Sequence, residues 1–332
     1  MKKIAVFHTG GTISMKKDDS GGVNMQGGNA LVNGVAAEME QLWSEEQIFG
    51  VASPQITEQH MFQLRQEILG KIKAGAEGIV VTHGTDTLEE TAYFLDITVP
   101  HTVPVVLIGA MRSFNDIGSD AVKNYQSAIT VASSDEAKDI GTVVVMNEEI
   151  HAARSVTKTH STNLATFQSP GFGYIGTLNA SGKVIIGRKL LPAPCYDISG
   201  MTKKVMLIKS FAGLDSTVFD AFDALEEKQG HFPIDGLVLE AFGVGNIPAR
   251  IVGCLQKLEK KGIPIVLGTR CLGGMPQPVY KYDGGGMSLK TEEVKSIIFA
   301  NGLNGPKARL KLAVLLETTS DIATIEAEFA KH

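Results

Sequence analysis

The chain contains 332 residues, of which 43% are hydrophobic, and carries a formal net charge of −5 at pH 7. This length and apolar content predict a sizeable core and roughly two domains. No run of Lys and Arg forms a basic stripe and no apolar run is long enough to cross a bilayer, so we expect neither nucleic acid nor a membrane as a partner. The three cysteines, Cys195, Cys254 and Cys271, are widely spaced without a metal-binding motif, which indicates a reduced, cytoplasmic protein.

In the first half of the chain, apolar runs alternate with helix-like stretches, a pattern typical of a parallel sheet with helices on both faces. The expected strands are 4–7, 78–82, 102–108 and 141–146, and the expected helices are 32–43, 58–74, 87–95 and 119–133. The run 4–7 is too short for the core of a signal peptide. A polar stretch at 14–29 follows it, which predicts either a disordered insertion or an active-site lid, and its position directly after Thr12 favours the lid. Between 147 and 187 helical periodicity is lost, so hairpins are expected there.

The second half begins after a stretch rich in proline and glycine and repeats the alternation on a smaller scale. Its expected strands are 205–211, 237–241 and 263–268, and its expected helices are 216–227, 248–261, 292–301, 305–317 and 320–329. The fold class is therefore α/β, with a parallel sheet in each half. We expect an N-terminal catalytic domain over 1–190, a linker over 191–204 and a smaller C-terminal domain over 205–332.

Two similar motifs, Thr9-Gly-Gly-Thr12-Ile13 and His83-Gly-Thr85-Asp86-Thr87, each follow an expected strand. The carboxyl edge of such a sheet is where ligands bind, glycine allows close approach of the backbone, and threonine supplies a hydroxyl. Two hydroxyls with a carboxylate beside one of them predict nucleophilic chemistry on a small polar substrate. Neither motif is a dinucleotide fingerprint or a phosphate-binding P-loop, which disfavours a dinucleotide-dependent oxidoreductase.

Each motif also has an ordinary structural interpretation. The first can be a tight turn, and Thr85 or Asp86 can simply cap the helix at 87–95. His83 is interpreted as a packed residue at the end of a strand. Lys158, in Val-Thr-Lys-Thr, is typical of a solvated strand face and gains functional interest only if it meets Asp86.

Taken together, the motifs resemble those of the bacterial-type L-asparaginase family, in its cytoplasmic form. The matching segments are Thr9–Ile13, His83–Ala92, Gly109–Arg112, Arg154–Thr159 and Gly243–Asn246, which follow the family order through nearly the whole chain. The resemblance implies a larger flavodoxin-like N-terminal domain and a smaller α/β C-terminal domain. It also implies a homodimer or a homotetramer built as a dimer of dimers, with each active site between one subunit's N-terminal domain and its neighbour's C-terminal domain.

The implied reaction is hydrolysis of L-asparagine to L-aspartate and ammonia, and the ratio of asparagine to glutamine activity stays open. An amide is a poor electrophile, so a positioned hydroxyl helps by dividing the reaction into acylation and deacylation. By residue-wise match, Thr12 and Thr85 are the catalytic threonines, with Thr12 as the nucleophile. Lys158 and Asp86 accompany Thr85. Burial lowers a lysine pKa and a nearby carboxylate raises it, so we assign a Thr85–Lys158–Asp86 unit and no single base.

The same match assigns the substrate contacts. Asp86 anchors the α-ammonium group, Ser53 receives the α-carboxylate, Ala110 lines the amide end, and Asn246 is offered across the subunit interface. No cofactor is implied, and the spacing of His, Cys and Asp residues matches no metal site.

The chain departs from the family pattern in two places. The family lid commonly contributes a tyrosine beside the first threonine, whereas this chain has no tyrosine before Tyr93. Pro54 stands where many relatives carry glutamine, so one substrate contact is missing or comes from backbone. Tyr282 and Asp283 are the candidates for a group lent by the neighbouring subunit.

Two other functions share these motifs. The amidase subunit of a tRNA-dependent amidotransferase carries an extra domain ahead of the first strand, whereas the first strand here begins within the first few residues. A non-catalytic amino-acid sensor would keep the pocket without needing both threonines, the lysine and the aspartate. Ammonia release from asparagine distinguishes the sensor from the enzyme.

Overall fold

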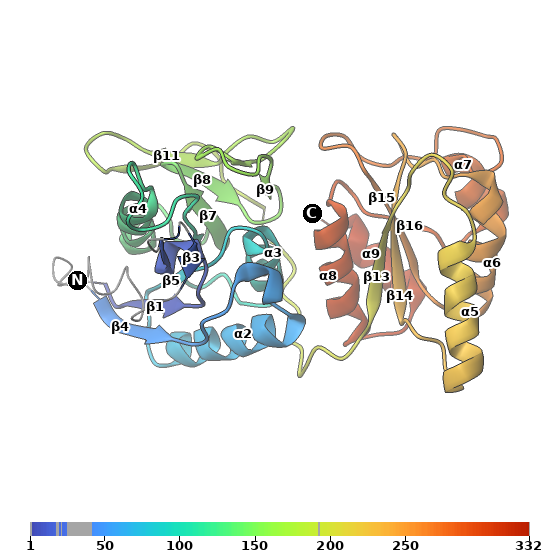
Figure 1. The fold of residues 1–332 in the computed structure, drawn as a ribbon, viewed down its shortest axis with the longest axis horizontal. Coiled ribbons are helices and arrows are strands. Elements are labelled where there is room, and N and C mark those ends of the chain that lie inside the picture. Colours follow the sequence, from blue (N-terminus) through green and yellow to red (C-terminus); the bar gives the residue numbers. More distant parts are fainter. Residues whose placement is uncertain (1, 18–19, 21, 25–41, 192, 332) are drawn as a thin grey trace. The chain divides into compact units, whose positions relative to one another are not determined.

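The computed structural model describes residues 2–17, 20, 22–24, 42–191 and 193–331 (Figure 1). The chain divides into two compact units, Met1–Cys195 and Tyr196–His332. Each unit contains its own sheet with helices packed against it, so the α/β fold class with a larger and a smaller sheet is confirmed. No helix within these residues is both long and apolar enough to cross a membrane.

The first unit is built on an eight-stranded sheet in the order β12-β11-β8-β7-β6-β5-β1-β4. Five neighbouring strands run parallel: β4 (Leu42–Gln47), β1 (Ile4–His8), β5 (Gly78–Thr82), β6 (Val105–Ile108) and β7 (Thr142–Met146). Three antiparallel strands extend the other side: β8 (Glu149–Ala152), β11 (Gly176–Leu178) and β12 (Val184–Ile186). Every residue of β1, β5, β6 and β7 is buried, which explains their continuous apolar runs.

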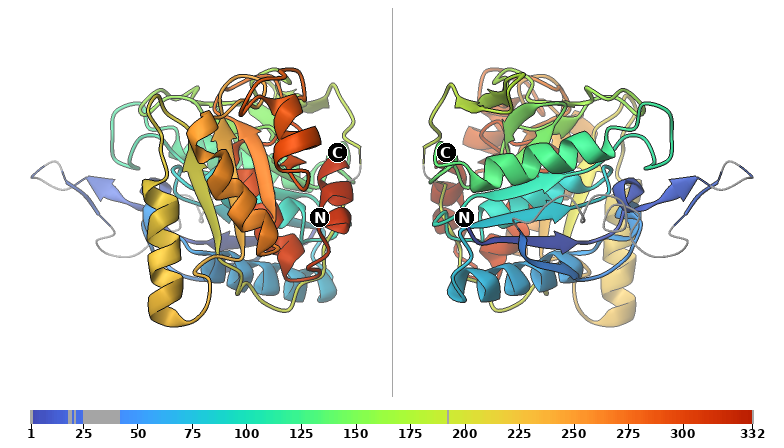
Figure 2. Two further views of the ribbon diagram at one scale, coloured as in Figure 1. Left: turned by 90° about the vertical axis from the view of Figure 1, so that its right-hand side faces the viewer. Right: turned by 90° about the vertical axis from the view of Figure 1, so that its left-hand side faces the viewer.

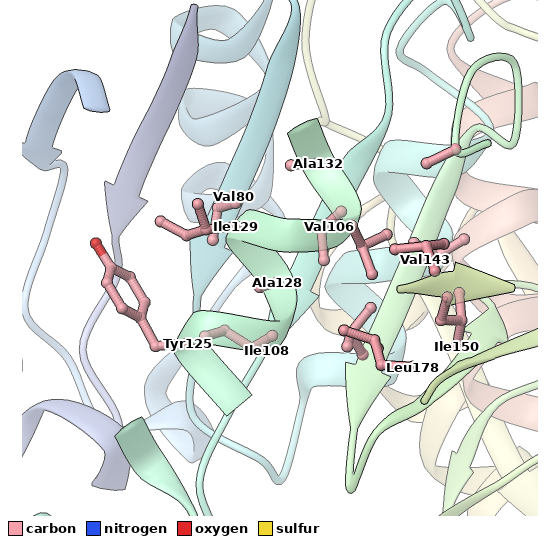
Figure 3. Packing of buried hydrophobic residues seen from close by; sticks show 14 of the residues in the cluster. Val80, Val106, Ile108, Tyr125, Ala128, Ile129, Ala132, Val143, Ile150 and Leu178 are labelled. Carbon is pink, nitrogen blue, oxygen red and sulfur yellow. The ribbon is translucent and has the colours of Figure 1, made fainter. Parts of the chain in front are cut away.

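Helices cover both faces of this sheet. Figure 2 shows α4 (Ala121–Ser133) and α2 (Glu58–Lys73) on opposite sides, and α3 (Leu88–Asp96) packs with α2. The α4 face forms a continuous apolar cluster, in which Val80, Val106 and Val143 from three strands meet Ala128 and Ile129 of α4 (Figure 3). This packing holds the strand ends, where the predicted functional motifs begin, in a fixed order.

The helix boundaries follow local capping chemistry. Thr57 caps α2 in a reciprocal capping box with His60. Helix α4 begins at Ala121, two residues later than the expected start at 119, with Asp120 as its N-cap. The Asp120 carboxylate accepts the backbone N–H groups of Met111 and Arg112 instead of capping its own helix.

The segment after β1 contains short elements that were not predicted. A single 3₁₀ turn, η1 (Thr12–Ser14), leads into a small hairpin of β2 (Lys16–Lys17) and β3 (Val23–Asn24). The rest of the predicted lid and most of the predicted helix 32–43 lie outside the described residues. That helix does not reach residue 43, because Leu42 and Trp43 begin β4, which pairs in parallel with β1.

The second unit has four parallel strands in chain order: β13 (Val205–Lys209), β14 (Gly236–Ala241), β15 (Ile265–Thr269) and β16 (Ile298–Phe299). Helices α5 (Thr217–Gln229) and α6 (Val252–Lys260) contribute to one apolar cluster with this sheet, after a short 3₁₀ turn η4 (Ala249–Ile251). Helix α8 (Gly305–Leu316) packs on β13–β15, and α9 (Ile322–Ala330) packs on β16.

The predicted helix at 292–301 is wrong. A short helix α7 (Gly286–Ser288) continues into a π-helical turn η5 (Leu289–Glu293), and the chain then enters β16. Ile297 and Ile298 are completely buried, and Ile298 pairs with Val266 of β15. An apolar pair with β-branched side chains is better accommodated in a sheet edge than in a helix, which accounts for the difference.

Candidate active site

The two threonine motifs lie side by side at the carboxyl ends of neighbouring strands. Strands β1 and β5 pair in parallel with His8 opposite Thr82, the last residue of each strand. The backbone N–H and the hydroxyl of Thr9 both donate to the carbonyl oxygen of Thr82, at 3.1 and 2.9 Å. The turns that follow the strands, 9–12 and 83–86, therefore leave the sheet from the same edge.

Glycine is required where these turns touch. A Cβ atom on Gly11 would lie 2.3 Å from the Cα atom of Gly84, and one on Gly84 would lie 2.6 Å from the Cβ atom of Ser53. Gly10 would meet the carbonyl oxygen of Val51 at 2.5 Å. Gly10 and Gly11 also have φ values of 104° and 85°, which side-chain-bearing residues rarely adopt. Three backbone segments thus pack directly against each other beneath the threonines.

Lys158 joins the second motif through its side chain. It lies on β9 (Thr157–Lys158), which pairs with β10 (Phe167–Gln168) in the region predicted to form hairpins. Its Nζ atom donates to Thr85 Oγ1 at 2.9 Å and to Asp86 Oδ1 at 2.6 Å. Thr85 is 7% exposed, whereas the Asp86 side chain is 56% exposed. The lysine therefore connects a buried hydroxyl to a carboxylate that faces solvent.

Ser53 meets the same turn from another segment. It begins a 3₁₀ turn, η3 (Ser53–Gln55), with Pro54 in its first positions, and it is buried. Its hydroxyl oxygen accepts the Asp86 N–H at 3.2 Å, and its carbonyl accepts the Thr87 hydroxyl at 2.9 Å. Ser53 is thus tied to the second turn through both its side chain and its backbone.

Ala110 follows the end of β6 and is buried beside the second motif. A Cβ atom on its neighbour Gly109 would lie 2.8 Å from Thr85 Cγ2. The Gly109 carbonyl accepts the Asn124 side-chain amide at 3.0 Å. Together with the two N–H groups bound by Asp120, this contact fixes the loop against α4.

His83 has a structural role, in agreement with its interpretation as a packed strand-end residue. Its Nδ1 lies 2.7 Å from the Gly84 carbonyl oxygen, and its Nε2 lies 2.9 Å from Thr91 Oγ1. Burial lowers the pKa of the imidazole from 6.5 to about 4. A carbonyl only accepts, so Nδ1 carries the proton and the neutral ring accepts the Thr91 hydroxyl at Nε2.

The remaining predicted residues divide between the two units. Thr12 begins η1 and is half-buried, one residue beyond the contact between Gly11 and Gly84. Asn246 belongs to the second unit, where its side-chain oxygen accepts the Gly286 N–H at 3.2 Å. Tyr282 is 52% exposed and Asp283 is also exposed in that unit. Within the described part of the chain, no three His, Cys, Asp or Glu side chains are grouped as metal ligands.

The sequence reasoning missed a buried polar chain beneath the first motif. His8, 2% exposed, contacts Thr82 Oγ1 at 2.8 Å through Nδ1 and Glu45 Oε1 at 2.9 Å through Nε2. Tyr125 of α4 donates its hydroxyl to the same Glu45 oxygen at 3.0 Å. The available signal was a histidine at the end of an otherwise apolar strand. Its partner could not be identified because the strand carrying Glu45 was not predicted.

The chain is similar to known proteins over most of its length. Residues 3–191 match the family model described as asparaginase, N-terminal, and residues 204–329 match the glutaminase/asparaginase C-terminal domain. The chain is 37% identical over 321 residues to an L-asparaginase of Bacillus licheniformis, covering 95% of each protein. It is 32% identical over 295 residues to a glutaminase-asparaginase of Acinetobacter glutaminasificans, covering 85% of this chain and 83% of the relative.

Among solved structures, the chain is similar to the crystal structure of a probable cytoplasmic L-asparaginase from Campylobacter jejuni. The TM-score is 0.85 at 33% sequence identity, and the match covers 100% of both chains.

Proposed function

The chain belongs to the asparaginase family, and from this premise we propose that it hydrolyses L-asparagine to L-aspartate and ammonia through a covalent intermediate on Thr12. The observation that carries the proposal is the bridge from Lys158 Nζ to Thr85 Oγ1 and Asp86 Oδ1, at 2.9 and 2.6 Å. It joins a hydroxyl, an ammonium group and a carboxylate at the sheet edge where the turn that carries Thr12 also begins.

Two groups hold the amino-acid end of the substrate. The exposed Asp86 carboxylate receives the α-ammonium group, and the Ser53 hydroxyl donates to the α-carboxylate. Opposite charges within about 4–6 Å favour both charged forms, which supports an Asp86 contact to the ammonium group. With these ends fixed, the side-chain amide extends toward the two threonines, and Ala110 borders its far end.

Acylation begins when the Thr12 oxygen attacks the side-chain amide carbon. The carbon–nitrogen bond then breaks, and the leaving nitrogen takes up the hydroxyl proton, so ammonia departs and a β-aspartyl ester remains on Thr12. Backbone N–H groups of the two glycine-threonine turns are suitable donors for the developing oxyanion, and loss of one such donor typically costs about 10²–10³ in rate.

Deacylation uses the second motif. Thr85, hydrogen-bonded to Lys158, directs a water molecule to the ester carbon. The water contributes its hydroxyl to aspartate, and its proton returns to the Thr12 oxygen. Lys158 and Asp86 act with Thr85 as one unit in this step.

Several finer properties belong to the same proposal. We place glutamine as a minor substrate, since one relative is a glutaminase-asparaginase. We propose a cytoplasmic homodimer or homotetramer in which Asn246 completes the neighbouring subunit's site. The domains are 1–190 and 205–332, joined by 191–204.

Ammonia release from L-asparagine and L-glutamine tests the proposal in the wild type, Thr12→Ala, Thr12→Ser and Thr85→Val. We expect asparagine activity to be lost in Thr12→Ala and Thr85→Val and partly retained in Thr12→Ser. Thr162→Ala, an exposed threonine after β9, is the matched control and should keep full activity. A wild type that binds asparagine without releasing ammonia would favour the amino-acid sensor.

A further inference from the structure

The polar chain from Tyr125 through Glu45 and His8 to Thr82 includes the last residues of β1 and β5, from which the two threonine motifs continue. It connects α4, the edge strand β4, β1 and β5. His8 is four residues before Thr12, and Thr82 is three residues before Thr85. Figure 3 shows Tyr125 at one end of the apolar cluster, with its hydroxyl directed away from the labelled aliphatic side chains.

The donors and acceptors at Glu45 can be assigned from the chemistry of its hydrogen-bond partners. The hydrogen bond from His8 lowers the pKa of Glu45, so the carboxyl group is ionised and only accepts. It therefore receives the Tyr125 hydroxyl and the Nε2–H of His8. His8 Nδ1 lies 2.8 Å from Thr82 Oγ1, so the hydrogen-bond network continues to the end of β5. Each side-chain group along the chain has a partner that matches it.

The backbone turns that follow His8 and Thr82 have little room for movement. Thr82 binds His8 through its hydroxyl and Thr9 through its carbonyl, so one residue anchors the start of the first turn twice. One step further on, Gly11 and Gly84 are in direct backbone contact. Any displacement of the end of β1 therefore changes the position of Thr12 relative to Thr85.

The substrate contacts also have hydrogen bonds of their own, which do not involve His8 or Glu45. Ser53 is tied to the second turn by the Asp86 N–H and the Thr87 hydroxyl, and Asp86 is tied to Lys158. A change at His8 or Glu45 should therefore affect the nucleophile more than the groups that receive the substrate's charged end.

We propose that His8 and Glu45 are positioning residues, which act through Thr82 and the end of β1 to hold the Thr12 hydroxyl in its attacking position. This inference rests on the proposed function of Thr12. It assigns a role to a polar pair in which His8 is buried and the Glu45 side chain is 20% exposed.

The test is a set of variants on β4, assayed for kcat and KM with asparagine. Glu45→Ala removes the acceptor for His8 and Tyr125, whereas Glu45→Gln keeps an oxygen that accepts. We expect Glu45→Ala to lower kcat by about 10-fold or more with KM changed by less than about threefold, because misplacement of a reacting group by about 1 Å costs up to about 10²-fold. Glu45→Gln should stay within about threefold of the wild type in both constants.

Glu46→Ala is the matched control. Glu46 is the next residue on the same strand, points to the other face and pairs with Lys71, so its loss should leave both constants unchanged. His8→Leu, which removes the bridge from the other side, should reproduce the kcat loss of Glu45→Ala.

Wild-type kcat in folded Glu45→Ala, a parallel rise in KM, or equal losses in Glu45→Ala and Glu45→Gln would overturn the positioning role. If Glu45→Ala does not fold, His8→Leu breaks the same His8–Glu45 contact, and an unchanged kcat in that variant has the same meaning. Thr12→Ala in the same assay separates the two proposals. Activity retained there refutes the nucleophile, whereas activity lost there with normal Glu45→Ala refutes only the positioning pair.

Discussion

Lys158 Nζ lies within hydrogen-bonding distance of both Thr85 Oγ1, at 2.9 Å, and Asp86 Oδ1, at 2.6 Å. The lysine side chain is 17% exposed, so its charge is partly removed from water and compensated by the carboxylate. One ammonium group thus joins the hydroxyl proposed to act in the chemistry to the carboxylate proposed to bind the substrate. This arrangement couples the proposed deacylation step to the proposed recognition of the substrate ammonium group.

Lys158→Met is expected to lower kcat by about 10²–10³-fold, because Thr85 loses its charged donor in a partly buried site. KM should rise as well, since Asp86 loses the group that orients it. The measurement is steady-state ammonia release from asparagine. Lys183→Met, at an exposed hairpin position, is the control. A Lys158→Met enzyme with wild-type kcat would remove Lys158 from the mechanism.

Gly11→Ala is expected to abolish activity, because its Cβ would lie 2.3 Å from the Gly84 Cα atom and its φ of 85° disfavours any side chain. Gly70→Ala, by contrast, should stabilise the protein. Gly70 lies inside α2 with nothing within 4 Å of an added Cβ, so alanine should raise the free energy of unfolding by about 0.5–1 kcal/mol. Ammonia release measures the loss of activity in Gly11→Ala, and urea unfolding measures the gain in stability in Gly70→Ala. Full activity in Gly11→Ala would contradict the close packing of the turns.

The pH dependence of stability should reflect the buried histidines. Burial lowers the pKa values of both His83 and His151 from 6.5 to about 4. The unfolded chain therefore binds protons more readily than the folded chain between these values. The contribution of the two neutral histidines to the free energy of unfolding is fully present above about pH 6.5 and is lost as the pH falls toward 4. For fully buried His83 this contribution is about 3 kcal/mol.

The measurement is the free energy of unfolding in urea at pH 7.5, 6.0 and 5.0. His83→Gln should flatten the decline between pH 6.5 and 5, and the exposed His231→Gln should not. An equally steep decline in His83→Gln and the wild type would show that His83 is not a source of the pH dependence.

The edge of the sheet that carries the site was predictable, because it depends on local patterns. The buried runs of β1 and β5 end at glycine-threonine turns, and parallel pairing brings such ends together. The meeting of Lys158 with Asp86 required more than spacing, since the lysine is carried by a separate hairpin. The resemblance to a family supplied that pairing, and the 2.6 Å contact agrees with it.

The parts that were not predictable depend on tertiary partners. Strand β4 has no apolar alternation to identify it, because Glu45 is satisfied by His8 and Tyr125 and Glu46 by Lys71. Strand β16 exists because β15 offers an edge for Ile298. The contribution of Asn246 to a neighbouring site stays a prediction, since it depends on a second copy of the chain.

The most direct test of the central claim is to locate the covalent intermediate. The Thr85→Val enzyme is mixed with asparagine, quenched in acid and digested with trypsin, which separates Thr12 on peptide 4–16 from position 85 on peptide 74–112. Slow deacylation should leave a β-aspartyl adduct on peptide 4–16, and Thr12→Ala should abolish it. An adduct on peptide 74–112 of the wild type, or asparagine turnover by Thr12→Ala, would contradict Thr12 as the nucleophile.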